Sequence, residues 1–143
     1  MLTPDALDTL TGIGIFSRCE RATLAAAFVS LKVPAACILA LEDEPAQYVF
    51  VVQRGLLSVR TYVSRSVYAT ELIAAGEVAG EERLFGRPRY LGTIRTLRDS
   101  EALVGDAAFL RAQASAGFAF DIAAAAYRRL ESARNATLTR FYR

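Results

Sequence analysis

The middle of this chain, from Lys32 to Gly105, alternates short apolar segments with turn residues at a spacing of about ten residues. Several of these segments are rich in β-branched and aromatic residues, which favour strands. Pairs such as Arg54-Gly55 and Ala75-Gly76 separate them as turns. The expected strands are 37–41, 47–53, 56–63, 67–73, 91–97 and 101–104. Short strands at this spacing indicate a β-barrel or a jelly roll.

Helical spacing precedes this region over the first 31 residues. A short helix is predicted over 4–10, with Pro4 at an early position where its missing N–H costs nothing. A second helix is predicted after Ser17, because Ser17 and Glu20 have the spacing of a capping box. Its apolar face is expected to carry Leu24, Phe28 and Leu31.

The end of the chain also has a helical pattern. Asp106 is predicted to cap a short helix over 107–112, and Gly117 separates it from a run over 118–142 that contains no Pro or Gly. Residues recur in this run at alternating four- and three-residue steps: Ala119, Ala123, Ala126, Leu130, Ala133 and Thr137. The steps are typical of a coiled-coil seam. A helix of about 25 residues spans about 37 Å, more than one face of a domain this size.

We therefore expect a homodimer that forms through this C-terminal helix, the alternative being a helix packed only on its own barrel. The expected organisation is a β domain over 1–116 with its N-terminal helices, followed by the dimerisation helix over 117–143.

Composition limits the function classes. The 17 basic and 15 acidic residues give a net charge of +2, which is too balanced for nucleic-acid binding by the overall field. No apolar stretch reaches about 18 residues, and the acidic segment from Met1 to Asp8 does not have the pattern of a signal peptide. We therefore expect a cytoplasmic protein without a membrane span. Histidine is absent and there are only two cysteines, Cys19 and Cys37. Zinc, haem and iron–sulfur sites therefore lack their usual ligands, and we expect no metal and no enzyme.

Several short segments stand in a fixed order along the chain. They are Gly14-Ile15-Phe16-Ser17, Glu42-Asp43-Glu44-Pro45-Ala46 with Tyr48 to Gly55, Ala75 to Glu81, Pro88-Arg89, and Thr93 to Ser100. These segments resemble motifs of the cyclic-nucleotide-binding domain family, and the last helix resembles the dimerisation helix of Crp/Fnr-type bacterial transcription regulators. The resemblance is to the N-terminal sensor domain of those regulators. It implies a mainly β fold with flanking helices, a double-stranded β-helix (jelly roll or β-roll), plus the long C-terminal helix.

The resemblance also implies a ligand site, whose ligand would be cAMP, another cyclic nucleotide or another small anion. Gly80 would let backbone N–H groups approach the phosphate, and a short helix over 82–85 would favour the anion at its N-terminus. Glu81 would accept a hydrogen bond from the ribose 2′-OH, and Arg89 would donate to the phosphate. The remaining residues expected at the ligand are Glu82, Tyr90 and Thr93.

Two interpretations remain open. The first is the ligand-sensing and dimerisation domain of a Crp/Fnr-like regulator, which binds a cyclic nucleotide through Gly80-Glu81 and Arg89. The second is a degenerate module without a nucleotide ligand, which acts as a structural or protein-interaction dimer. Three residues support it. Tyr90 occupies the family's arginine position when residues are counted back without gaps from Thr93, Leu91 replaces the small polar residue that follows that arginine, and Glu82 replaces a usually apolar residue.

DNA binding is expected only through a domain outside this chain. Regulators of this type continue past the long helix into a helix-turn-helix domain, and this sequence stops at Arg143, where that domain would begin.

Overall fold

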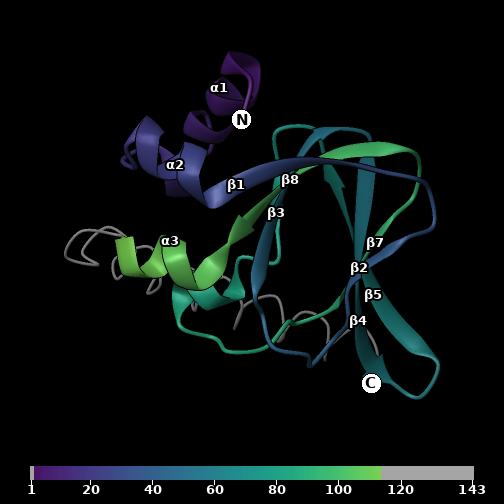
Figure 1. The fold of residues 1–143 in the computed structure, drawn as a ribbon. Coiled ribbons are helices and arrows are strands. Elements are labelled where there is room, and N and C mark those ends of the chain that lie inside the picture. Colours follow the sequence, from purple (N-terminus) through teal and green to yellow (C-terminus); the bar gives the residue numbers. More distant parts are fainter. Residues whose placement is uncertain (1, 114–143) are drawn as a thin grey trace.

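Two antiparallel four-stranded sheets face each other in the computed structural model, which describes residues 2–113 (Figure 1). Sheet A has the strand order β1-β8-β3-β6, and sheet B has the order β2-β7-β4-β5. The strands are β1 (Phe28–Val33), β2 (Ile38–Ala40), β3 (Tyr48–Arg54), β4 (Leu56–Ser64), β5 (Val67–Ala74), β6 (Val78–Ala79), β7 (Thr93–Thr96) and β8 (Ser100–Asp106). All six predicted strands are present with shifted ends, so the mainly β fold is confirmed.

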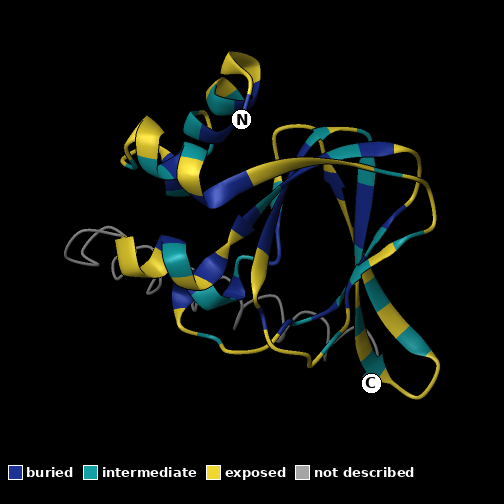
Figure 2. Cartoon of the chain, in the orientation of Figure 1, coloured by how far each residue is buried: buried dark blue, intermediate teal, exposed yellow. Residues whose placement is uncertain are grey.

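Helices cover the face of sheet A that points away from sheet B (Figure 1). They are α1 (Pro4–Thr11), the 3₁₀ helix η1 (Gly14–Phe16), α2 (Arg21–Ala27), the 3₁₀ helix η2 (Glu82–Phe85) and α3 (Ala107–Gln113). The central strand β3 of sheet A is therefore buried on both faces, whereas most of the edge strand β1 is exposed (Figure 2). Val49 and Val51 of β3 pack among the helices, while Phe50 and Val52 point between the sheets. Successive side chains of β3 pack in two different cores, and this is why the sequence of the strand is a continuous apolar run.

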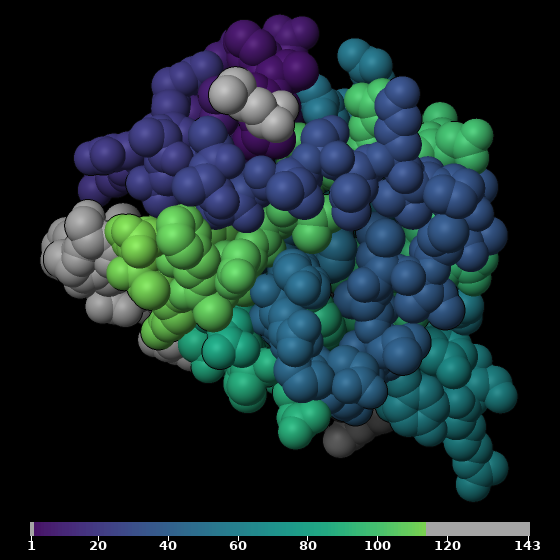
Figure 3. All heavy atoms as spheres, viewed as in Figure 1, coloured from purple at the N-terminus to yellow at the C-terminus, as the bar shows by residue number. Residues whose placement is uncertain are grey.

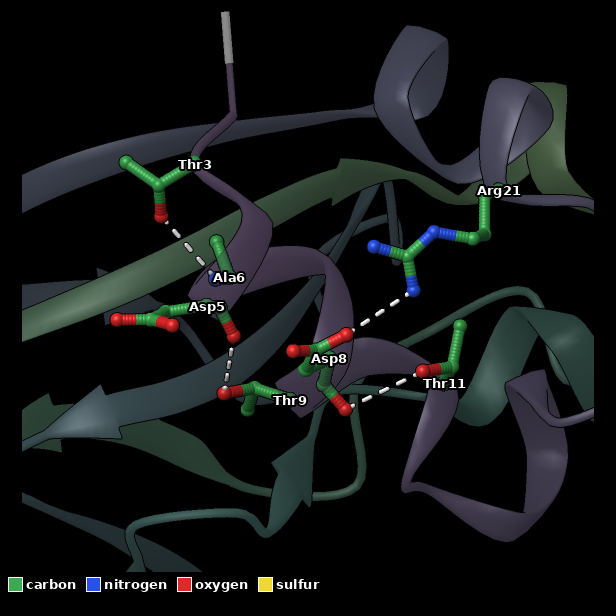
Figure 4. Close-up of polar contacts among 7 residues, drawn as sticks. All are labelled: Thr3, Asp5, Ala6, Asp8, Thr9, Thr11 and Arg21. Atoms are coloured by element: carbon green, nitrogen blue, oxygen red, sulfur yellow. Dashed lines mark hydrogen bonds and ion pairs between the residues drawn. The ribbon is translucent and has the colours of Figure 1, made fainter.

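Local side-chain contacts order the N-terminal helices (Figure 4). The Thr3 hydroxyl accepts from the Ala6 N–H at 3.1 Å and caps α1, as a threonine at this position favours. Arg21 of α2 donates to Asp8 of α1 at 3.1 Å. Both side chains are largely exposed, so this ion pair orients the two helices but contributes little to stability.

The second helix differs from its prediction. It begins at Arg21, with Glu20 in the N-cap position, so the cap assigned to Ser17 was wrong. The Ser17 hydroxyl instead donates to the Gly14 carbonyl at 2.8 Å, at the end of η1. Ser17 therefore lies at the end of η1 and not at the start of α2, because the helical spacing around it also suits a short 3₁₀ helix.

The helix also ends earlier than predicted. Phe28 and Leu31 lie in β1, which pairs with β8 along its whole length. The ring of Phe28 packs edge-to-face on Phe16, with centroids 5.4 Å apart, and lies over Gly105 of β8. Pairing with β8 therefore overrides a helical spacing that is visible in the local sequence.

The last described helix matches its prediction. The Asp106 carboxylate accepts from the Phe109 N–H at 3.0 Å and caps α3. The predicted dimerisation helix over 118–142 lies outside the described residues. No helix within residues 2–113 is long and apolar enough to cross a membrane.

Candidate functional site

A cleft of about 410 Å³ opens between the β4–β5 hairpin and the segment that joins β6 to η2. Its apolar side includes Val59, Ile73 and Leu91. The opposite side is formed by Gly80, Glu81 and Glu82. Alternation along β4 and β5 turns the cleft-lining residues inward, because the side chains of a strand point to alternate faces.

Gly80 lines this cleft where its backbone passes close to core side chains. Its φ of +74° lies in the left-handed region, which a residue with a side chain rarely adopts. A Cβ at this position would lie 3.0 Å from a ring carbon of Tyr90 and 3.2 Å from side-chain atoms of Ile94 and Phe50. Glycine therefore lets the backbone pass close over the core between the sheets, and η2 begins directly at the mouth of the cleft.

The short helix η2 is anchored from two directions. Leu84 and Phe85 are buried in the core beneath the helices. Arg111 of α3 donates to the Leu84 carbonyl at 2.7 Å, which satisfies a backbone acceptor at the end of η2. The sequence carries no signal for Arg111, since its role depends on how α3 packs on η2. The helix over 82–85 itself was predicted correctly.

Tyr90 is buried beside Gly80. Its hydroxyl donates to the Tyr48 carbonyl at 2.7 Å and accepts from the Tyr48 N–H at 3.0 Å. Burial raises the pKa of this hydroxyl, and the charge of Glu82 raises it further, whereas the hydrogen bond from the Tyr48 backbone lowers it. The neutral phenol thus ties the loop after η2 to the start of β3.

Arg89 is exposed and is directed to a different loop. Its guanidinium donates to the Asp43 carbonyl at 2.7 Å. The backbone here also pairs with residues 43–46: the Asp43 N–H donates to the Tyr90 carbonyl at 3.0 Å, and the Ala46 N–H donates to the Pro88 carbonyl at 2.9 Å. The segment 88–90 is therefore held against the turn before β3.

The six predicted site residues fall into two groups. Gly80, Glu81 and Glu82 line the cleft together. Arg89, Tyr90 and Thr93 do not belong to its lining; the Thr93 hydroxyl accepts from the Glu42 N–H at 3.1 Å. Ligand binding by any of the six remains a prediction.

The cleft also contains residues that the sequence interpretation did not single out. Val59, Thr61, Ala69 and Ile73 come from the inward positions of the hairpin. Leu91, which the sequence interpretation counted in favour of a module without a nucleotide ligand, also lines the cleft. Period-two alternation in β4 and β5 could have indicated the first four.

In the part of the chain that the structure describes, all charged side chains that line the cleft are acidic. Three carboxylates, of Glu71, Glu81 and Glu82, belong to its lining, and no lysine or arginine does. An anionic ligand in this cleft therefore requires a cation from outside that lining. Within residues 2–113, no group of three or more Cys, Asp or Glu side chains is arranged to hold a metal ion.

Comparisons with known proteins place these features in a family context. The family model described as "Cyclic nucleotide-binding domain" matches residues 30–116. No curated protein sequence matches this chain.

Solved structures share the fold at low sequence identity. The sensor domain of the transcriptional regulator DNR from Pseudomonas aeruginosa has a TM-score of 0.70 at 16% identity, over 90% of each chain. The N-terminal domain of a transcriptional regulator from Streptomyces coelicolor has a TM-score of 0.67 at 18% identity, over 87% of this chain and 94% of its own. The catabolite activator protein of Thermus thermophilus has a TM-score of 0.66 at 20% identity, over 84% of this chain and 59% of its own.

Proposed function

The chain belongs to the cyclic nucleotide-binding domain family, and on this basis we propose that it is the effector-sensing domain of a Crp/Fnr-like transcription regulator. The observation that carries the proposal is the cleft at Gly80, Glu81 and Glu82, which lies inside the matched segment and leads into η2. The extent of the likeness to two regulator domains, over 94% and 90% of their own chains, supports it. Such a regulator would contact DNA through another domain.

An effector in this cleft would act by shifting a conformational equilibrium. It would contact the β4–β5 hairpin on one side and the β6–η2 segment on the other. Because η2 is bonded to α3 through Arg111, a change at the cleft would reach α3 directly. A ligand that binds one arrangement of these elements more tightly would favour that arrangement. This role requires no catalytic residue.

A cyclic nucleotide is the first effector to test. Its phosphate would meet the backbone at Gly80, and its ribose 2′-OH would donate to Glu81. Arg89 would have to exchange its hydrogen bond to the Asp43 carbonyl for a bidentate pair with the phosphate. Two parallel hydrogen bonds to an anion are stronger than one to a neutral carbonyl, so phosphate would favour the exchange.

A second candidate is the degenerate module without a nucleotide ligand. The contacts of Tyr90 and Arg89 favour it, because both side chains already have protein partners outside the cleft. The carboxylates that line the cleft also favour it, since they repel a phosphate. The domain would then act through association with other protein surfaces.

Calorimetry on the 143-residue chain separates the two candidates. We expect cAMP or cGMP to bind with micromolar affinity, and both Arg89→Ala and Glu81→Ala to abolish that binding. Arg18→Ala, at an exposed arginine before α2, is the matched control and should bind as the parent chain does. Absence of heat at millimolar nucleotide would reject the cyclic nucleotide and favour the second candidate. Binding that survives Arg89→Ala would reject the role of that arginine.

A further inference from the structure

The outer face of sheet B, which points away from sheet A, exposes large apolar side chains. Strand register places Ile38, Arg95, Ser58 and Leu72 side by side in one row across β2, β7, β4 and β5. Ile38 is 61% exposed and Leu72 is 57% exposed at the two ends of this row, whereas Arg95 between them is half-buried and Ser58 is buried. Leu97 follows β7 and is exposed as well. Apolar side chains that gather on one face of a sheet are typical of a protein-binding surface.

An aromatic pair extends this face along the β4–β5 hairpin, which projects from the body of the molecule (Figure 3). Tyr62 and Tyr68 are paired across the hairpin, with ring centroids 5.8 Å apart in an edge-to-face arrangement. Exposed and partly buried residues alternate in the distal part of the hairpin, over 59–64 and 67–70 (Figure 2). The two exposed rings therefore belong to the outer face, while the inward residues of the same strands line the cleft.

The charge on this face is positive. Arg60 and Arg95 both point outward, since each is paired with other outward residues of sheet B. The four strands contain one carboxylate, that of Glu71, and it lies on the opposite side, in the cleft. At the margin, the Glu42 carboxylate accepts from the Tyr62 backbone N–H at 3.2 Å and so is directed at the strand backbone.

Arg60 is oriented to receive a carboxylate. Its guanidinium carbon lies 4.4 Å from the centroid of the Tyr68 ring, so the group stacks on the aromatic face. A stacked guanidinium keeps its N–H donors in its own plane, where they match the two oxygens of a carboxylate. Apolar side chains that flank such a carboxylate would lie over Leu72 and Tyr62.

We propose that the outer face of sheet B docks a segment of a partner protein in which carboxylates alternate with apolar side chains. Two arginines among several large apolar groups suit such a segment better than a nucleic acid, whose binding depends on many phosphate contacts. A second copy of the same face is also a poor match, since a two-fold axis would bring like charges together. The surface lies on the other side of the sheet from the cleft, so it does not depend on an effector.

The test is a titration of the isotope-labelled 143-residue chain, followed by NMR. The probe is a short capped peptide that alternates Asp with Leu and Phe, and the comparison peptide has Lys in place of each Asp. We expect saturable shifts at the amides of β4, β5 and β7 with the acidic peptide only. Arg60→Glu should weaken binding at least about tenfold, because it removes a charge-assisted pair and adds a repulsion. Arg18→Glu, the matched charge reversal on the helical side, should bind normally.

Four results would overturn the proposal, provided that the variants keep dispersed spectra. The first is the absence of saturable shifts at millimolar acidic peptide. The second is equal binding of the lysine peptide, which would show that apolar contact alone causes the binding. The third is a tighter response of the same amides to a DNA duplex, which would assign the face to nucleic acid. The fourth is a self-association that Arg60→Glu abolishes, which would assign the face to a second copy.

Discussion

Single buried residues hold the connections of this fold, and Thr96 is the clearest example. Its hydroxyl donates to the Pro34 carbonyl at 2.6 Å and accepts from the Cys37 N–H at 2.9 Å, so it fixes the β1–β2 connection from β7. Thr96→Val keeps the shape but leaves both backbone groups without this partner. We expect a loss of about 2 kcal/mol in the free energy of unfolding, measured with urea. Thr70→Val, at an exposed strand position, should change it by less than about 0.5 kcal/mol. Equal losses in the two variants would contradict the role of Thr96.

Tyr90 makes the free energy of unfolding depend on pH in the alkaline range. Because burial raises its pKa above the ordinary value of 10.0, the unfolded chain loses this proton at a lower pH than the folded chain does. The contribution of Tyr90 is therefore complete below about pH 10 and is lost as pH rises through the folded pKa. Urea unfolding of the parent chain between pH 8 and 11 should show this loss, and Tyr90→Phe should reduce its slope. Tyr68→Phe, at an exposed ring, should leave the slope unchanged. An identical slope in Tyr90→Phe would mean that other groups cause the loss.

At the scale of elements, the β6–η2 connection depends on the space around Gly80. Gly80 and Gly76 both have positive φ, at +74° and +83°, but of the two only Gly80 has core atoms within 4 Å of the place that a methyl group would occupy. Gly76→Ala should therefore cost about 1 kcal/mol from backbone strain alone. Gly80→Ala should cost about 3 kcal/mol, because the added methyl also crowds Tyr90 and Ile94. Thermal unfolding of the pair measures the difference, and equal costs would show that crowding is absent.

The elements also show what the sequence could predict. Strands β3 to β5 were predicted well, since alternation and turn residues are local signals that agree with the final pairing. Phe28 and Leu31 were misassigned because β1 is stabilised by β8, which lies far away in the sequence. At the site, Gly80 and the helix over 82–85 were expected from the family resemblance, and the structure places both at the cleft. The directions of Arg89 and Tyr90 depend on contacts with residues 43–48, which no local pattern encodes.

At the scale of the whole molecule, the two sheets have different surroundings. Sheet A lies between the helices and sheet B, whereas the outer face of sheet B exposes Ile38, Leu72 and the hairpin tyrosines around a buried Ser58. Inward residues of the β4–β5 hairpin line the cleft on one side of sheet B, and outward residues of the same hairpin belong to the proposed docking face on the other side. A charge reversal at Arg60 should therefore affect partner binding without changing the cleft, since its side chain and the cleft-lining residues alternate along one strand.

Association of whole chains is the remaining prediction at this scale. The seam expected over 118–142 lies outside the described residues, and it predicts a homodimer. Sedimentation velocity of the chain should give a dimer at micromolar concentration. Leu130→Glu should weaken the dimer at least about tenfold, because two carboxylates would meet inside an apolar seam. Arg128→Glu, at a position that the spacing assigns to the outer side of the helix, should leave it intact. A monomer at every concentration would reject the dimer, whereas a dimer that survives Leu130→Glu would reject the seam and require another interface.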